Sequence, residues 1–478
     1  MSSHSQFYID GKWTDAESAQ ALDVIDPASE SAVAKISLGS HADVDKAVAA
    51  ARRAFTDFST TTKDERIALL ERIVGCYESR QEELAQLVSK EMGSLIGFSR
   101  TEQVPSGLGH FQQTLETLKA YDFEEDHGST RWSREPIGVC AMITPWNWPL
   151  NQIAAKVAPA LAAGCTMVLK PSEIAPLDAF VVAEILHEAG VPAGVFNLVN
   201  GTGPDVGEYM AGHPGVDMVS FTGSTRAGIL VAKAAAGTIK RVTQELGGKS
   251  PNILLDDADM ETAVSGGVLG CFGNAGQSCD APSRMFVPAS RYEEAVEIAK
   301  NTAEGVSNRQ PLDDNAKAED IGPVVSQIQY DKIQGLLEKG VSEGARVVVG
   351  GPGRAEGFNK GYFVRPTVFA DVHNEMTVAR EEIFGPALSM IPYKSEDEAI
   401  ALANDTPYGL AGYVSSGDLA RARHVASRIR AGNIYINGAP PDSSAPFGGY
   451  KQSGNGREFG MLGLEEYLEV KAIAGHQA

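Results

Sequence analysis

The feature that most constrains the fold is an alternation of short apolar segments with amphipathic helical segments, which occurs twice along the chain. The first run lies between Trp132 and Leu254. It predicts strands at Val139–Ile143, Thr166–Leu169, Val195–Leu198, Met218–Phe221 and Val242–Glu245, and helices that begin near Asn151, Leu177, Pro204 and Thr225. Strands and helices that alternate in this way form a parallel sheet covered on both faces.

A second alternating run follows Pro251 and predicts a second α/β domain. Its strands are expected at Asn252–Leu255, Met285–Val287, Arg346–Val349, Thr367–Phe369, Leu388–Ile391, Gly412–Val414 and Asn433–Ile436, with helices such as Arg291–Val306 and Ser326–Ser342 between them. The fold class is therefore α/β, with two open parallel-sheet domains. A chain of 478 residues agrees with more than one domain.

The first ~115 residues show mostly helical periodicity, with apolar stripes in Asp43–Phe55 and Lys63–Met92. Two charged, strand-like segments belong to neither alternating run, namely Ala120–Arg134 and Gly463–Ile473. We expect them to pair with each other or with another subunit, because an exposed strand edge favours pairing.

Composition excludes several classes of function. The formal net charge of −21 disfavours nucleic acid and anionic membranes as partners, since both bind basic surfaces. No apolar run approaches the ~18 residues of a membrane span, and Met1–Asp10 does not resemble a signal peptide, so a cytoplasmic protein is expected. The five cysteines suggest no disulfide framework, and no cluster has the spacing of a metal site.

Two segments carry groups suited to covalent chemistry. Cys279 lies among small polar residues in Phe272–Arg284, where a thiolate would be accessible as a nucleophile, although a small buried side chain is the usual state of a cysteine. Glu245 ends an apolar strand and precedes two glycines. It is either a general base for water or the thiol, or a solvated acid at the end of a strand.

Two further segments present hydrogen-bond donors at the start of a helix. Asn147 lies between tryptophans and prolines in Pro145–Lys156, and its amide either stabilises an oxyanion or caps the helix. Ser224 lies where a strand ends and a helix begins, in Val219–Gly228. Its hydroxyl and the free N–H groups there either contact a phosphate or form an ordinary cap.

The segment Val168–Pro176 places Lys170 and Glu173 at the end of a strand. Together they either hydrogen-bond ribose hydroxyls or form a surface ion pair. The glycine run Gly201–Gly207 resembles a dinucleotide-binding motif, but its last spacing is three residues instead of two, and Pro204 interrupts it, so it is a weak signal alone.

Seven motifs in the same order resemble those of the aldehyde dehydrogenase superfamily, over nearly the whole chain from Phe7 to the C-terminal tail. They are TPWNWPL, VLKPSE, SFTGST, QELGGKSPNIL, FGNAGQSC, EEIFGP (Glu381–Pro386) and PFGGYKQSGNGRE (Pro446–Glu458). The resemblance implies a Rossmann-like cofactor domain (1–118 and 138–247), a catalytic domain (248–452) and a small β oligomerisation arm (119–137 and 453–478). It also implies a homodimer or homotetramer.

The resemblance also assigns roles. Cys279 is the nucleophile, Glu245 the general base, and Asn147 with the Cys279 N–H forms the oxyanion hole. NAD, with NADP as an alternative, is expected to contact Ile143, Pro145, Trp146, Lys170, Ser172, Glu173, Gly203, Gly207, Phe221, Gly223, Ser224, Leu246, Gly247, Glu382 and Phe384. The substrate tunnel is expected at Trp148, Gln152, Ser278 and Asp280, with the small Ala155 nearby and its mouth at Ala439–Ala445.

The expected reaction is oxidation of an aldehyde through a cysteine thiohemiacetal and a thioester, which Glu245 hydrolyses by activating water. Glu245 argues against a CoA-acylating or phosphorylating relative, and the complete set of Cys279, Glu245 and Asn147 argues against a non-enzymatic one. Asp280 disfavours a carboxylate near the aldehyde. Trp148 with Ala155 leaves room for a medium aliphatic or aromatic aldehyde.

Overall fold

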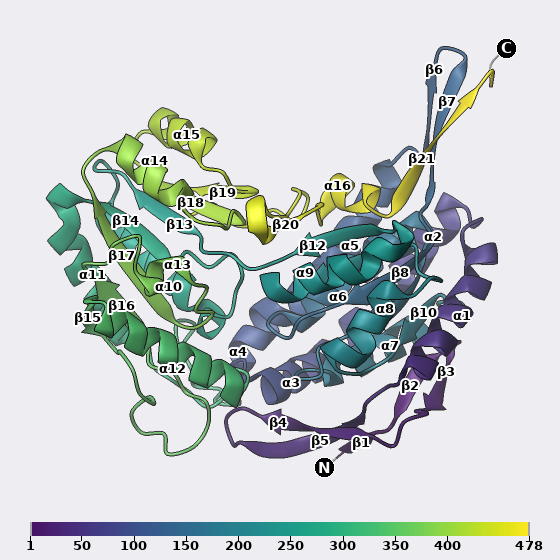
Figure 1. The fold of residues 1–478 in the computed structure, drawn as a ribbon, viewed down its shortest axis with the longest axis horizontal. Coiled ribbons are helices and arrows are strands. Elements are labelled where there is room, and N and C mark those ends of the chain that lie inside the picture. The colour runs from purple at the N-terminus through teal and green to yellow at the C-terminus, as the bar shows by residue number, and fades with distance from the viewer. Residues whose placement is uncertain (1, 477–478) are drawn as a thin grey trace.

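Two open sheets and two three-stranded sheets organise the chain in a computed structural model that describes residues 2–476 (Figure 1). The elements up to residue 136 are β1 (Ser2–His4), β2 (Gln6–Ile9), β3 (Lys12–Asp15), β4 (Ala21–Asp26), β5 (Ser31–Ser37), α1 (His41–Phe58), α2 (Lys63–Ser79), α3 (Gln81–Met92), α4 (Ile96–Phe98), the π-helical η1 (Ser99–Gln103), α5 (Val104–Ala120), β6 (Glu124–His127) and β7 (Thr130–Pro136).

The first alternating run forms the parallel part of an eight-stranded sheet. Its elements are β8 (Val139–Ile143), α6 (Pro149–Ala163), β9 (Thr166–Lys170), α7 (Leu177–Glu188), β10 (Phe196–Leu198), the π-helical η2 (Gly203–Gly207), α8 (Glu208–Gly212), β11 (Met218–Thr222), α9 (Thr225–Ala235), the 3₁₀-helical η3 (Ala236–Thr238) and β12 (Arg241–Glu245). The sheet order is β20-β12-β11-β8-β9-β10-β2-β3. Every residue of β8, β9 and β11 is buried, which accounts for their continuous apolar sequences.

The second alternating run forms a seven-stranded sheet in the order β15-β16-β17-β14-β13-β18-β19. The remaining elements are β13 (Pro251–Leu254), α10 (Met260–Phe272), η4 (Gly273–Gly276), β14 (Arg284–Pro288), η5 (Ala289–Arg291), α11 (Tyr292–Gly305), α12 (Gln327–Ser342), β15 (Arg346–Val349), β16 (Thr367–Ala370), α13 (Thr377–Arg380), β17 (Ala387–Tyr393), α14 (Glu396–Asn404), β18 (Ala411–Ser415), α15 (Leu419–Arg428), β19 (Asn433–Ile436), η6 (Lys451–Ser453), β20 (Gly454–Asn455), α16 (Gly460–Glu465) and β21 (Leu468–Ala474).

The two alternating runs predicted from the sequence are therefore confirmed, with strand boundaries that differ by one or two residues. The N-terminal helical periodicity holds only from His41 onward, because the residues before it form five short strands. The helical stretch Lys63–Met92 is also divided, since α2 and α3 meet at Arg80. The strands before His41 are short, so their sequences carry little alternation: β1, β5 and β4 form a separate three-stranded sheet, and β2 and β3 lie at one end of the eight-stranded sheet.

The two charged segments pair with each other. Strand β21 lies antiparallel to β7 from Leu468 opposite Pro136 to Ala474 opposite Thr130, and β6 completes the sheet β21-β7-β6. Figure 1 shows this arm projecting from the rest of the molecule, with the C-terminus at its tip. Among the helices within residues 2–476, none is long and apolar enough to cross a membrane.

Candidate active site

The strand order of the first sheet places several loops beside one cavity. The chain runs from β8 outward through β9 to β10 and then returns to β11 on the other side of β8, so the loops after β8 and β11 diverge. Such a switch point, at the carboxyl ends of parallel strands, is where open α/β sheets bind ligands. The loops that precede β14 and β17 of the second sheet contribute Cys279 and Glu382 to the same cavity.

The cavity has a volume of about 200 Å³ and brings together most of the residues predicted from the sequence. Its lining consists of Pro145, Trp146, Asn147, Gln152, Thr222, Gly223, Ser224, Glu245, Leu246, Gly247, Cys279, Gln329, Lys332, Glu382 and Phe384. The three residues predicted to carry the chemistry, Cys279, Glu245 and Asn147, thus face one space although they come from both halves of the chain.

Cys279 is partly exposed, unlike Cys140, Cys165 and Cys271. It follows a strained turn, in which Asn274 and Ala275 both adopt positive φ values of 54° and 55°. Burial raises the pKa of the Cys279 thiol well above its usual value, and the carboxylates of Asp280, Glu245 and Glu382 raise it further. The thiol is therefore protonated in this state and needs a proton acceptor before it can attack.

Asn147 does not cap a helix. The N-cap of α6 is Trp148, which makes no side-chain cap hydrogen bond, and Asn147 Nδ2 instead donates to the carbonyl of Gln277 at 3.0 Å. The carbonyl of Asn147 accepts from Asn274 Nδ2 at 2.8 Å and from Gln103 Nε2 at 3.2 Å. These bonds fix the amide beside the loop that carries Cys279.

Glu245 is 4% exposed, so it is not a solvated acid at the end of a strand. Neither of its carboxylate oxygens has a hydrogen-bond partner among the described residues. Burial raises the pKa of Glu245 well above its usual value, the nearby Glu458 raises it further, and Lys156 opposes this increase. A buried carboxyl group with an elevated pKa is suited to accepting a proton near neutral pH.

Lys156 and Glu458 were missed in the sequence analysis. Lys156 is fully buried in α6, pairs with Glu458 and donates to Thr222 Oγ1 at 2.7 Å. One signal was available, because Lys156 is the only charge in the apolar helix PLNQIAAKVAPALAA, and a lone charge in such a helix requires a buried partner. Nothing in the sequence around Glu458 identifies it as that partner.

Glu382 lines the cavity from the loop before β17. Its Oε1 accepts the N–H of Gly248 at 2.9 Å, and burial raises its pKa. A Cβ atom at Gly247 would lie 2.5 Å from the Glu382 carboxylate, so only glycine allows this approach. Phe384, in a positive-φ conformation, meets the Trp146 ring edge-on at 5.4 Å.

The other residues predicted to bind the cofactor lie outside this cavity, and all except Phe221 on β11 lie around the end of β9. Lys170 is 2% exposed and pairs with Glu173 at 3.0 Å, so the ion pair exists but its lysine is buried. The Ser172 side chain accepts the N–H of Ile174 at 3.3 Å. Gly207 in η2 lies beside Lys170 and Ile143, where a Cβ would make ordinary van der Waals contacts at 3.6 and 3.8 Å. Gly203 begins the same π-helical turn.

Ser224 does cap a helix, as one of its two interpretations predicted. Its hydroxyl accepts the N–H of Ala227 at 3.3 Å at the start of α9, and the residue also lines the cavity. Gly223 packs against the ring of Phe221, where a Cβ would lie 2.6 Å from the ring. The two roles are compatible, since the hydroxyl of a capping serine still faces the space above the helix.

A larger cavity of about 700 Å³ adjoins the other side of the Cys279 loop. Trp148, Ser278 and Asp280 line it, as predicted for the substrate tunnel, whereas Gln152 lines the smaller cavity. The loop residues Ala439, Pro440 and Pro441 lie at its wall, and Ala155 is buried without reaching either cavity. Three other aromatic residues line the larger cavity and were missed in the sequence analysis, namely Phe98, Tyr413 and Tyr435.

The chain resembles proteins of one family along its whole length. The aldehyde dehydrogenase family pattern matches residues 13–473. A 3-succinoylsemialdehyde-pyridine dehydrogenase of a Pseudomonas species is 56% identical over 100% of both chains. Among solved structures, a mutant of aldehyde dehydrogenase C from Pseudomonas syringae, in complex with NAD⁺ and octanal, is 53% identical, with 99% and 97% of the two chains covered and a TM-score of 0.97.

A second solved structure, an aldehyde dehydrogenase from Mycobacterium tuberculosis in complex with NAD⁺, is 40% identical, with 99% and 98% of the chains covered and a TM-score of 0.96. The chain therefore belongs to the aldehyde dehydrogenase family. It is an enzyme that oxidises an aldehyde to the carboxylic acid through a thiohemiacetal and a thioester on a cysteine.

Proposed function

We propose that this enzyme uses NAD⁺ to oxidise a medium-sized aliphatic or aromatic aldehyde, with Cys279 as nucleophile, Asn147 as oxyanion donor and Glu245 as general base. The observation that carries the proposal is the position of Cys279, which lines the smaller cavity while its neighbours Ser278 and Asp280 line the larger one. A cofactor in one cavity and an aldehyde in the other would meet at the thiol.

The residues around the smaller cavity fit a dinucleotide. The start of α9 presents N–H groups and Ser224 for a pyrophosphate. The Glu382 carboxylate lies against the backbone of Gly247 and can accept hydrogen bonds from ribose hydroxyls. Lys170 and Glu173 would hold the other ribose, and the Glu173 carboxylate would repel the 2′-phosphate of NADP. Both structural relatives described above contain NAD⁺.

The remaining predicted contacts fall in the same region. Ile143 ends β8 and Pro145 and Trp146 follow it. Ser172 lies beside Lys170, and Gly203 and Gly207 belong to the turn η2. Phe221 and Gly223 precede α9, Leu246 follows Glu245, and Phe384 would pack near the nicotinamide. NAD⁺, when bound, supplies the acceptor for the hydride that leaves the thiohemiacetal carbon.

The groups of the chain perform the other steps. Glu245 accepts the proton of the Cys279 thiol, and the thiolate adds to the aldehyde carbon. Asn147 Nδ2 and the Cys279 N–H donate to the resulting oxyanion, a type of contact worth roughly 3–4 kcal/mol. Once the thioester has formed, Glu245 releases the thiol proton to solvent and is again a carboxylate. It then takes a proton from water, and the hydroxide displaces the thiolate to release the carboxylic acid.

The lining of the larger cavity supports the proposed substrate class. Its aromatic side chains provide apolar surface, and its two carboxylate side chains, Asp259 and Asp280, are not matched by any Lys, Arg or His in the lining. A substrate with a second carboxylate would meet like charge next to the reacting carbon. The Pseudomonas relative is named for a semialdehyde of pyridine, and the structure from Pseudomonas syringae contains octanal.

We further propose a homodimer or homotetramer that assembles through the arm, and the domain boundaries 1–118 with 138–247, 248–452, and 119–137 with 453–478. On one face of the arm, Trp132 and Val470 are 41% and 65% exposed. Exposed apolar side chains on a strand edge favour pairing between subunits. A cytoplasmic location agrees with five free cysteines.

The test measures NADH formation on a panel of aliphatic, aromatic and dicarboxylic semialdehyde substrates. We expect wild type and Cys76→Ala to be active and Cys279→Ala to be inactive, because Cys76 matches Cys279 in exposure but lies on α2. Activity of the Cys279→Ala variant would refute the role of Cys279 as the nucleophile. Turnover that depends on added CoA or phosphate would indicate an acylating enzyme, and a dicarboxylic semialdehyde as best substrate would refute the proposed class.

A further inference from the structure

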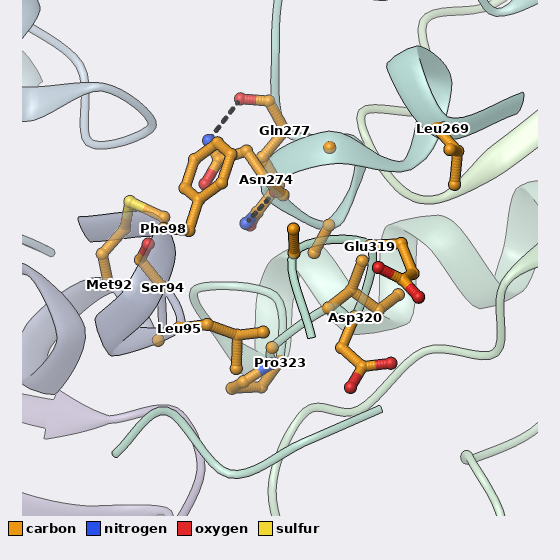
Figure 2. A pocket seen from close by; sticks show the side chains of 16 residues that line it. Met92, Ser94, Leu95, Phe98, Leu269, Asn274, Gln277, Glu319, Asp320 and Pro323 are labelled. Atoms are coloured by element: carbon orange, nitrogen blue, oxygen red, sulfur yellow. Dashed lines mark hydrogen bonds between the residues drawn. The ribbon is translucent and has the colours of Figure 1, made fainter. Parts of the chain in front are cut away.

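A third cavity, of about 290 Å³, lies next to the proposed tunnel and shares part of its wall. Figure 2 shows its lining, which includes the apolar side chains of Met92, Leu95, Phe98 and Pro323. Two residues, Phe98 and Gly273, line both this cavity and the 700 Å³ tunnel. We call the boundary between the two spaces the partition. It consists of the Phe98 ring on one side and Gly273 on the other.

The glycine side of this partition leaves a passage. A Cβ atom at Gly273 would meet nothing within 4 Å, so the space beside it is open. Along α10, Gly266 and Gly270 also line the tunnel, and a Cβ at Gly266 would again meet nothing within 4 Å. This side of the tunnel thus lacks large side chains from the middle of α10 to the partition.

The aromatic side of the partition is held by a single ring contact. Phe98 ends the three-residue helix α4, just before the π-helical η1, and its ring lies 5.5 Å from that of Trp148. Trp148 is anchored, because its indole N–H donates to Ser278 Oγ at 2.9 Å, next to the nucleophile. Phe98 has no such anchor, and it is partly exposed whereas its neighbours Ile96 and Ser99 are buried.

We propose that Phe98 is a specificity-determining residue, whose ring closes the substrate tunnel and so limits the length of aldehyde that the enzyme prefers. The proposal rests on the proposed function, since it assumes that the aldehyde enters by the 700 Å³ cavity. An extended chain bound at Cys279 runs along the glycine side of α10 until it meets Phe98. Without the ring, the chain continues past Gly273 into the third cavity.

The size of the effect follows from the burial of methylene groups. Each methylene that leaves water contributes about 0.8 kcal/mol, which corresponds to about a fourfold rise in kcat/KM. In the wild type, kcat/KM should rise with chain length and then level off where the chain reaches Phe98. Methylenes beyond that point stay in solvent or crowd the ring, so they add nothing.

The experiment measures kcat/KM for straight-chain aldehydes from butanal to tetradecanal. In Phe98→Ala, we expect the rise of about fourfold per methylene to continue beyond the wild-type plateau. Adding Gly273→Val to Phe98→Ala should restore the early plateau, because the side chain fills the passage. Leu95→Ala is the control: it enlarges the third cavity at a wall that the tunnel does not share, so its plateau should match the wild type.

A Phe98→Ala enzyme that levels off at the wild-type chain length would overturn the proposal, and so would an equal change at every length. Phe98→Leu, which keeps an apolar side chain at this position, gives the same test with an intermediate plateau if the alanine variant does not fold. Butanal oxidation reports on the proposed function separately: a wild type that oxidises no aldehyde contradicts that function, whereas an unchanged plateau contradicts only the role of Phe98.

Discussion

The buried pair of Lys156 and Glu458 should control both the stability of the enzyme and the pH range of its activity. Replacing Glu458 by Gln leaves the Lys156 ammonium fully buried without its ion-pair partner, with Thr222 Oγ1 as its remaining hydrogen-bond acceptor. Breaking a buried ion pair in this way costs about 3–5 kcal/mol. The free energy of unfolding of Glu458→Gln should fall by that amount in urea titrations.

The same substitution should move the pH profile in a defined direction. Glu458 raises the pKa of Glu245 and Lys156 lowers it, so removing the Glu458 charge lowers the pKa of Glu245. Glu245 acts as a base in its ionised form, so activity rises with pH as it ionises. The acid limb of kcat, measured at saturating aldehyde and NAD⁺, should therefore shift to lower pH.

Two further variants separate these effects. Lys156→Met combined with Glu458→Gln removes both charges and should recover part of the lost stability. Asp320→Asn breaks another ion pair, with Arg309, that does not affect the pKa of Glu245, so it should leave the acid limb in place. A Glu458→Gln enzyme within about 1 kcal/mol of wild type would refute the stability argument, since roughly 3–5 kcal/mol is expected. An acid limb that moves to higher pH would refute the effect of the Glu458 charge on Glu245.

Three other substitutions test separate parts of the site. Asn147→Ala should lower kcat/KM by about 10²–10³-fold in single-turnover assays, and a loss below about tenfold would contradict its role as oxyanion donor. Glu173→Gln should raise the ratio of kcat/KM with NADP⁺ to that with NAD⁺, because a repulsive charge near the 2′-phosphate is removed; an unchanged ratio would place the ribose elsewhere. Gly276→Ala should destabilise the enzyme by more than about 1 kcal/mol, since Gly276 has a φ of 74° and a Cβ would overlap the backbone of Gly385. Its control Gly335→Ala, in the open interior of α12, should be neutral or stabilising in the same urea titration.

The sequence predicted the two sheets well because most of their central strands are buried on both faces. Strands such as β8 and β9 are continuous apolar segments bounded by helices, a pattern that few folds besides a covered parallel sheet produce. The short strands before His41 have no such pattern, since β4 and β5 are mostly exposed or half-buried and belong to a separate three-stranded sheet, β1-β5-β4. Their place is set by tertiary contacts, which local periodicity does not record.

The residues of the site also fall into those that local sequence identified and those that it did not. Cys279, Glu245 and Asn147 lie in distinctive loops, so local sequence identified them as candidates, but each retained a second interpretation until the structure showed its surroundings. The hydrogen bond of Asn147 to the Gln277 carbonyl excluded the alternative that Asn147 caps a helix. The burial of Glu245 excluded the alternative that it is a solvated acid. Glu458 could not be found, because its partner Lys156 is 302 residues away.

The charges around Cys279 offer a physical reason for the order of the two half-reactions. The Glu245 carboxylate raises the pKa of the Cys279 thiol, so a negative charge on either group disfavours a second charge on the other. Transfer of a proton from the thiol to Glu245 keeps one charge between them, which favours attack by the thiolate on the aldehyde. After the thioester forms, the sulfur carries no charge, and Glu245 can ionise again without opposing it. Glu245 is therefore protonated while the thiolate attacks the aldehyde, and it can activate water after the thioester has formed.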